Sequence, residues 1–151
     1  AMLTEQPKMP GLDGQKMSKS YNNTIALRED PKSVEQKIKT MPTDPARVRR
    51  SDPGDPEKCP VWALHKVYSN DDVKKWVVQG CTTAGIGCLE CKRPVIDAIQ
   101  VELTPIRERA MEYVNDKSAV QAILEKGAAD AREIARDTLD EVRKAMGLVG
   151  K

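Results

Sequence analysis

Apolar residues recur every three or four positions over much of the chain, which is the spacing of one face of an α-helix. The first such stretch follows Asp30 and Pro31. This pair is typical of a helix start, because aspartate caps the helix and proline lacks an N–H group that would have no partner there. A short helix is therefore predicted over residues 31–40. Residues 1–24 hold two prolines, two glycines and no apolar period, and so predict an extended loop.

Residues 41–60 carry five prolines, and three of these follow an aspartate. This pattern excludes a continuous helix and predicts an ordered loop. Helical spacing returns at Pro60, after which four apolar residues share one face: Val61, Leu64, Val67 and Tyr68. A further short helix is predicted over 71–79, with Gly80 as its end.

The rest of the chain predicts two long amphipathic helices. One apolar series begins at Val95 and runs to about residue 115, and Pro105 inside it is expected to bend the helix rather than break it. A second series runs from Val120 to Met146, with an interruption expected near Gly127. Because no alternating strand pattern longer than a few residues occurs, the sequence predicts an all-α fold, a helical bundle behind a long N-terminal loop.

Composition limits the class of protein. The 151 residues suffice for one compact core. That core must be aliphatic, because aromatic residues are scarce; Trp62 and Trp76 are interpreted as part of it. The formal net charge is only +2, so any nucleic-acid contact has to come from local clustering. The chain shows neither a bilayer-spanning apolar run nor a signal-peptide pattern, which predicts a cytoplasmic protein without a membrane partner.

The segment GLDGQKMSKSY at residues 11–21 places two lysines and two serines on a glycine-bearing loop. Flexible ammonium groups, with hydroxyl donors beside them, can approach a chain of phosphates and follow its charge as it moves. Lys16 and Lys19, with Ser18 and Ser20, are therefore candidates for binding a polyphosphate. A solvated linker has the same composition, and physical reasoning alone favours the linker.

The pentapeptide KMSKS at residues 16–20, in the setting PGLDGQKMSKSYNNTI, resembles the signature of class I aminoacyl-tRNA synthetases, and in particular of the bacterial tryptophanyl enzymes. The resemblance extends through essentially the whole chain. It implies that the loop closes on ATP, bound with Mg²⁺ in the intact enzyme. It also implies that Lys16 and Lys19 are catalytic and stabilise the pyrophosphate as tryptophan attacks the α-phosphate. By the same resemblance Met17, Ser18 and Ser20 shape this ATP-binding loop.

The second signature of the family, His-Ile-Gly-His, has no counterpart here, because the chain's one histidine is His65 in LHKVY. We interpret His65 as a surface or helix-face residue. The resemblance therefore implies the carboxyl-terminal half of a synthetase. Residues 1–24 would be the KMSKS loop with a remnant of the nucleotide-binding domain, and residues 25–151 the helical anticodon-binding domain. The intact enzyme is expected to be a homodimer that joins tryptophan to tRNA(Trp). This part alone is expected to be inactive, with both loop lysines disordered.

Four cysteines have the spacing C-x21-C-x6-C-x2-C: Cys59, Cys81, Cys88 and Cys91. Disulfides are disfavoured by the expected cytosolic location. Four unrelated buried thiols are the simpler alternative, because free cysteine packs as a small hydrophobe. Three of the four lie within eleven residues, among glycines and small polar residues, and this clustering favours a metal site with four thiolates.

The residues leave the identity of the metal open. Zinc sites usually combine two close cysteine pairs, and only Cys88 and Cys91 form one here. Cys59 precedes Pro60, a junction that also occurs in iron–sulfur runs. The spacing resembles that of tryptophanyl enzymes carrying a [4Fe-4S] cluster. We therefore predict a [4Fe-4S] cluster, with zinc as the alternative. The alternative for the whole chain is a stand-alone iron–sulfur or zinc RNA-binding module without ligase activity; a redox protein is a third interpretation.

Basic residues flank the cysteines and could form a local positive site for an RNA strand. Single-stranded bases are recognised by stacking and by their edges, while cations hold the phosphates. In the resembling family the helical domain receives the anticodon, which implies tRNA contacts around residues 88–97. The candidate tRNA-binding residues are Arg49, Arg50, Lys92, Arg93 and Asp97.

Overall fold

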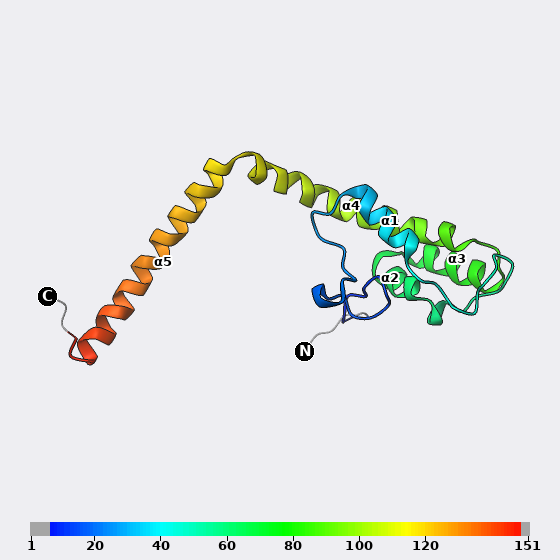
Figure 1. The fold of residues 1–151 in the computed structure, drawn as a ribbon, viewed down its shortest axis with the longest axis horizontal. Helices are drawn as coiled ribbons and strands as arrows, with labels where there is room; N and C mark the ends of the chain where they lie inside the picture. Colours follow the sequence, from blue (N-terminus) through cyan, green and yellow to red (C-terminus); the bar gives the residue numbers. More distant parts are fainter. Residues whose placement is uncertain (1–6, 149–151) are drawn as a thin grey trace. The chain divides into compact units, whose positions relative to one another are not determined.

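The computed structural model describes residues 7–148 of the chain, and within that range it is helical and contains no strand. The α-helices are α1 (Pro31–Thr40), α2 (Pro60–Tyr68), α3 (Asp71–Thr82), α4 (Cys88–Asn115) and α5 (Lys117–Ala145), and the short 3-10 helices are η1 (Lys19–Tyr21) and η2 (Pro56–Lys58). The predicted all-α class is confirmed. Figure 1 follows this order from the N-terminal loop to α5.

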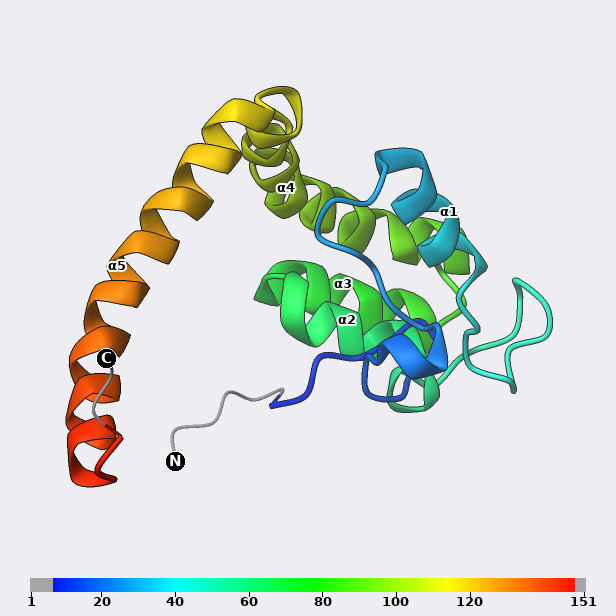
Figure 2. The same ribbon diagram turned by 60° about the vertical axis from the view of Figure 1, so that its left-hand side comes forward.

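The chain divides into two compact units between Arg107 and Glu108. In the first unit, α1 and α2 pack against the first half of α4, as Figures 1 and 2 both show. The core of this unit is built from apolar side chains of these three helices and the residue after α1: Val34, Ile38, Met41, Val61, Leu64, Val95, Ile96, Ile99 and Leu103.

The N-terminal loop reaches this core. Leu12 and Ile25 are partly buried and pack against the core cluster, so the loop lies on the helical region rather than apart from it. The assignment of residues 1–24 and 25–151 to separate functional regions stays a prediction. The contacts within the fold do not divide the chain there.

The short helices agree with the sequence patterns at their starts. The Asp30 carboxylate accepts hydrogen bonds from the backbone N–H groups of Lys32 and Ser33, 2.9 and 3.2 Å long, and so caps α1 as predicted. The predicted end of a helix at Gly80 is wrong, because α3 continues to Thr82. A Cβ atom at Gly80 would lie 2.7 Å from Cγ2 of Ile86, so glycine here allows the following turn to approach the helix.

Both long helices are continuous, and α4 is not broken at Pro105, as the sequence predicted. Pro94 and Pro105 lie inside α4 without ending it. The interruption expected near Gly127 is absent, because α5 runs through that residue. One glycine costs a helix about 1 kcal/mol, which is too little to divide a long helical run. No residue of α5 is buried within the described structure.

Neither tryptophan is a fully buried core residue, contrary to the sequence prediction. Trp62 is half-buried, and its Nε1 donates a 2.8 Å hydrogen bond to Glu57. The side chain of Trp76 is 42% exposed. Both lie on short helices whose opposite faces supply the buried residues. Among the described helices, none is both long and apolar enough to cross a membrane.

Lys92 ties the start of α4 to the end of α1. It is only 3% exposed, and its Nζ donates 2.7 Å hydrogen bonds to the carbonyl oxygens of Lys39 and Met41. Carbonyls at a helix C-terminus lack helical partners, and a cation there also complements the helix dipole. Burial lowers the pKa of Lys92. The prediction that Lys92 contacts tRNA is therefore wrong, because its ammonium group is buried against the end of α1.

Replacing Lys92 with methionine should lower the free energy of unfolding by about 1–3 kcal/mol, because the two carbonyls at the end of α1 lose their donor. Urea unfolding followed by tryptophan fluorescence measures this change. Lys75→Met is the matched control, since Lys75 is exposed on α3 in the same unit. It should change the free energy by less than about 0.5 kcal/mol. Equal losses in the two variants would contradict the role given to Lys92.

Candidate functional site: a lysine loop and a four-cysteine cavity

The lysine loop is folded back on itself by backbone hydrogen bonds. Pro10 and Lys16 form an antiparallel bridge, and the N–H of Met17 donates to the carbonyl of Met9 at 2.8 Å. The turn between them contains Gly14, whose φ of 81° is a conformation that favours glycine. The loop backbone therefore forms a defined turn, and the expectation that Lys16 and Lys19 are disordered in this part alone stays a prediction.

The side chains of the loop point to two environments. Met17 is half-buried and lines an apolar cavity of about 130 Å³ together with Ile25, Leu64 and Leu103. Lys16 and Lys19 are exposed, and neither ammonium group has an ion pair or hydrogen bond among the contacts of the described residues. Two cations three residues apart, with no anion paired to them in the described part of the chain, can bind a polyphosphate chain.

The two serines of the loop contact each other. Ser18 Oγ and Ser20 Oγ lie 2.8 Å apart, which places both hydroxyls on the same side of the loop as a pair. Lys19 and Ser20 belong to the 3-10 helix η1, which Asn22 ends with a φ of 53°. The predicted ATP-binding residues 16–20 thus form one continuous, locally ordered turn, and their function stays a prediction.

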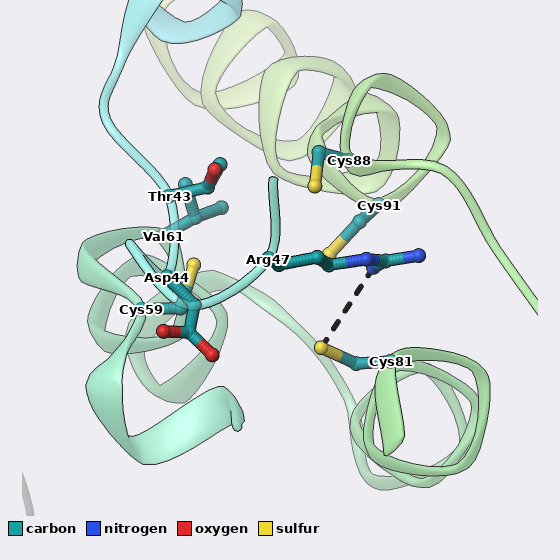
Figure 3. Close-up of a pocket in the computed structure, with 8 residues that line it drawn as sticks. All are labelled: Thr43, Asp44, Arg47, Cys59, Val61, Cys81, Cys88 and Cys91. Atoms are coloured by element: carbon teal, nitrogen blue, oxygen red, sulfur yellow. Dashed lines mark hydrogen bonds between the residues drawn. The ribbon is translucent and has the colours of Figure 1, made fainter. Parts of the chain in front are cut away.

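All four cysteines line one cavity, shown in Figure 3. Cys59 directly precedes α2, Cys81 lies in the last turn of α3, and Cys88 and Cys91 lie in the first turn of α4. The structure therefore brings together thiols that the sequence separates by up to 32 positions, counted from Cys59 to Cys91. The cavity has a volume of about 20 Å³, which is room for about one water molecule.

The four thiols are free, and no three of the His, Cys, Asp and Glu side chains within residues 7–148 lie together as a single-ion site. The metal centre stays a prediction. The type of ligand is nevertheless suitable for a metal ion or cluster bound by thiolates, because four thiols at the ends of three helices line the same cavity. A cation, Arg47, lies among them.

Arg47 fills the middle of the cavity. It is 8% exposed, and in Figure 3 its side chain runs between Cys81 on one side and Cys88 and Cys91 on the other. Its Nη1 lies 3.9 Å from the sulfur of Cys81, and its Nη2 donates to the carbonyl oxygens of Arg50 and Ile86 at 3.1 and 2.5 Å. Its buried Nε has no hydrogen-bond partner among the residues that the structure describes. An anionic group in this cavity would satisfy that donor.

Asp44 organises the loop that carries Arg47. Its carboxylate accepts hydrogen bonds from the backbone N–H groups of Asp55 and Ala46, at 2.8 and 3.0 Å. The bond from Asp55 and then that from Ala46 lower the pKa of Asp44. A buried carboxylate thus replaces regular secondary structure in holding the proline-rich loop against the cavity.

Burial favours the protonated form of two of the four thiols, those of Cys81 and Cys91. Burial raises the pKa of Cys91 to about 12, and neighbouring thiols add to this effect. Burial also raises the pKa of Cys81, although Arg47 opposes the shift. Four thiolates would repel one another here. A bound cation or cluster is therefore needed to stabilise the thiolate forms that bind metals.

His65 is a neighbour of the cysteines that the sequence analysis missed. It is fully buried, its Nδ1 lies 2.7 Å from Ser69 Oγ, and its Nε2 lies 3.1 Å from the carbonyl of Cys91 and 3.4 Å from the sulfur of Cys91. Burial lowers the pKa of His65 to about 4, so the ring is neutral at pH 7. Of the two interpretations of His65, as a surface or as a helix-face residue, the first is wrong, because the ring is buried on the inner face of α2. Its place one turn after Val61, on the buried face of α2, was the available signal.

A larger surface depression adjoins the cysteine cavity. It has a volume of about 560 Å³, and Arg47, Thr43 and Cys88 line both spaces. The other residues around it come from the proline-rich loop and the start of α4: Val48, Arg49, Arg50, Gly87, Leu89 and Glu90. Arg50 pairs with Glu90 at 3.0 Å, whereas no ion pair of Arg49 occurs among the described contacts.

The remaining predicted RNA-binding residues lie on the exposed side of α4. Arg93 is 3.4 Å from Glu35 and 3.2 Å from Asp97, so both of its partners are acidic. Arg49 and Arg50 gather at the depression, and Arg93 and Asp97 form an ion pair one to two turns further along the helix. The predicted set is thus not a single patch, and Arg49 is the member with the least compensated charge.

Comparisons with known proteins agree with the loop and the fold. The family model for class I tRNA synthetases (W and Y) matches residues 1–104. The tryptophan–tRNA ligase of Ralstonia nicotianae is 62% identical over 147 residues, which are 97% of this chain and 37% of that protein. The ligase of Thermotoga maritima is 48% identical over 150 residues, which are 99% of this chain and 46% of that protein.

Solved structures give the same relationship. The crystal structure of tryptophanyl-tRNA synthetase from Campylobacter jejuni, complexed with ADP and tryptophan, matches with a TM-score of 0.80 at 29% identity. The match covers 92% of this chain and 43% of that one. The chain thus spans less than half the length of the relatives that it matches. It belongs to the class I tRNA synthetases for tryptophan and tyrosine, and within that family it is similar to the bacterial tryptophanyl enzymes.

Proposed function

We propose that this chain is the part of a tryptophan–tRNA ligase that carries the ATP-facing lysine loop and receives the anticodon of tRNA(Trp). The intact enzyme, a homodimer, activates tryptophan with ATP and transfers it to the tRNA. The observation that carries the proposal is the pair of exposed ammonium groups of Lys16 and Lys19, which have no ion pair within residues 7–148, on a hydrogen-bonded turn. A module that never meets ATP has no need of this pair, which argues against the stand-alone RNA-binding module.

The loop acts on the phosphates of ATP bound with Mg²⁺. As the carboxylate of tryptophan attacks the α-phosphate, negative charge moves to the β- and γ-phosphates of the leaving pyrophosphate. Lys16 and Lys19 would neutralise this charge, and the hydroxyls of Ser18 and Ser20 would donate hydrogen bonds to phosphate oxygens. Met17 stays in its apolar cavity and holds the turn against the helical region.

Lys19→Ala in the full-length ligase should lower the rate of tryptophan-dependent exchange of pyrophosphate into ATP about 10²-fold or more, because a donor to the developing charge is lost. Lys32→Ala, which removes an exposed lysine on α1, is the control and should leave the rate unchanged. The described chain alone should show no exchange. Full exchange by Lys19→Ala would contradict the assigned role of the loop.

The four cysteines are proposed to hold a [4Fe-4S] cluster, with zinc as the alternative. Cys59, Cys81, Cys88 and Cys91 would be the ligands, and the guanidinium of Arg47 would move aside and offer its unpaired Nε to the anionic centre. When bound, the group cross-links α2, α3 and α4 and contributes its binding energy to folding. We assign it a structural role.

Protein purified without oxygen should contain about four iron and four sulfide per chain and absorb in the blue part of the visible spectrum, because four thiolates complete a [4Fe-4S] cluster. Cys88→Ser should lose most of the iron and lower the melting temperature. A colourless protein with stoichiometric zinc would show that the site binds zinc, the alternative, instead of a [4Fe-4S] cluster. A protein that contains neither metal, and whose melting temperature is the same with Cys88→Ser, would refute the metal site.

The surface depression beside the cysteines is proposed to receive an anticodon nucleotide. It offers apolar surface from Val48 and Leu89, which are 84% and 64% exposed, and cations from Arg49 and Arg50. A splayed base can stack on such surface while the arginines contact its phosphates. Arg93 and Asp97 hold each other at the edge of this region and contribute less charge.

Arg49→Glu should weaken binding of tRNA(Trp) about tenfold, or about 1.4 kcal/mol, because a phosphate contact is replaced by repulsion. The slope of log K against log salt should fall by about 0.7, as expected for one single-stranded phosphate. Filter binding at several salt concentrations measures both quantities. Lys75→Glu makes the same change of charge on α3 and should have little effect; equal losses in both variants would indicate a non-specific field rather than a site.

A further inference from the structure

A buried asparagine, Asn23, lies directly behind the lysine loop. It is only 3% exposed, although Tyr21 and Asn22 before it are exposed. Its Oδ1 accepts a 2.7 Å hydrogen bond from the N–H of Ser18. Its Nδ2 donates to the carbonyl of Lys16 at 3.1 Å and to Asp13 Oδ1 at 2.7 Å.

The chemistry of the partners fixes the orientation of this amide. The backbone N–H of Ser18 can only donate, so it must face the amide oxygen. The carbonyl of Lys16 and the carboxylate of Asp13 can only accept, so they must face the amide nitrogen. Both N–H groups of Asn23 are thus used, and all of its side-chain hydrogen bonds go to residues 13–18.

The side chain of Asn23 is tightly packed against the backbone of Gly11. A Cβ atom at Gly11 would overlap the Asn23 side chain, 2.5 Å from its Cγ, so the backbone passes there only because residue 11 is glycine. The carbonyl of Asn23 also accepts a 2.9 Å hydrogen bond from Leu12, which packs on the core. Asp13 Oδ1 accepts a second bond, from the N–H of Gln15 at 3.0 Å.

The amide holds the backbone on both sides of Met17 and leaves the two lysine side chains free. Its hydrogen bonds to the carbonyl oxygen of Lys16 and from the N–H of Ser18 fix the backbone from which the Lys16 and Lys19 side chains extend. Electrostatic stabilisation of a transition state depends on donors that are positioned before charge develops. A fixed backbone with mobile ammonium groups meets that requirement and still allows the groups to follow the leaving pyrophosphate.

We propose that Asn23 is a positioning residue of the adenylation reaction, whose side-chain amide, together with Asp13, fixes the Lys16–Ser18 backbone so that both ammonium groups are presented to the phosphates of ATP. This inference rests on the proposed function of the loop. Asn23 does not touch ATP; it acts through the backbone of the residues that do. Loss of the amide therefore reduces stabilisation of the transition state more than binding of ATP.

Asn23→Asp tests this role with a change of one side-chain group. The new carboxylate can no longer donate, and it is repelled by the carboxylate of Asp13 across the former 2.7 Å contact and by the carbonyl of Lys16. This repulsion moves it away from the N–H of Ser18, so that bond is weakened as well. Asn22→Asp is the charge-matched control, because it adds the same charge one residue away at an exposed residue whose side chain has no hydrogen bond among the described contacts. Its φ of 53° is one that aspartate tolerates.

Steady-state pyrophosphate exchange in the full-length ligase gives the functional result. Asn23→Asp should lower kcat by about 10- to 100-fold, as a small misplacement of catalytic groups does, and change KM for ATP by less than about threefold. Asn22→Asp should stay within about twofold of the wild type in both quantities. The exchanged pair Asp13→Asn with Asn23→Asp should recover part of kcat, because the amide at residue 13 can donate to the carboxylate at residue 23 and the bond from Ser18 returns, whereas the bonds to Lys16 and from Gln15 are missing.

Amide hydrogen exchange at Ser18, measured on the described chain, reports the positioning separately from activity. The Ser18 amide should be protected in the wild type and in Asn22→Asp and exchange at least about tenfold faster in Asn23→Asp. If Asn23→Asp does not fold, Asp13→Ala replaces it, with a loss of kcat of about threefold to tenfold because one partner of the amide is removed.

Unchanged Ser18 protection in Asn23→Asp would overturn the inference, as would lost protection with unchanged kcat, or equal losses of kcat in Asn22→Asp and Asn23→Asp. A change in KM alone would also overturn it, because it would assign Asn23 to binding. If the wild-type ligase shows no pyrophosphate exchange, the proposed function is refuted instead. The protection of the Ser18 amide from hydrogen exchange would then still decide whether Asn23 holds the loop.

Discussion

The packing of the first half of α4 against α1 and α2 is the contact on which the rest of the first unit depends. Val95, Ile96 and Ile99 supply the α4 side of this contact, and Val34 and Ile38 supply the α1 side. The same layer buries polar groups that need partners, which makes it specific as well as stable. Lys92 finds its partners in the end of α1, and the His65 ring finds Ser69 and the start of α4.

The cysteine cavity lies at one end of this packed layer. Its walls come from the starts of α2 and α4, the end of α3 and the loop held by Asp44. Any group bound by the four thiols would join segments that the apolar core only partly connects, since α3 contributes no residue to the core cluster. Arg47 now fills that position, and its unpaired Nε is the most evident unsatisfied polar atom of the described structure.

The lysine loop and the cysteine cavity belong to the same compact unit. Leu12 and Ile25 anchor the loop in the core, and Met17 lies in a cavity lined by residues of α2 and α4. The proposed ATP-facing and RNA-facing groups are therefore carried by one packed body of helices. Within that body the side chain of Asn23 makes the loop ordered even though its composition is that of a linker.

The sequence by itself determined the helices and the chemistry of the candidate residues. Asp30 with Pro31 identified the start of α1, helical spacing identified α2 and the long helices, and the spacing of the cysteines indicated a common site. These signals are local, because caps and periodic apolar faces act within a few residues. The tertiary structure alone decided the burial of Lys92 and Arg47, the partners of His65 and the hydrogen bonds of Asn23. Each of these depends on carbonyls or carboxylates supplied by distant segments or by a turn whose shape no short pattern specifies.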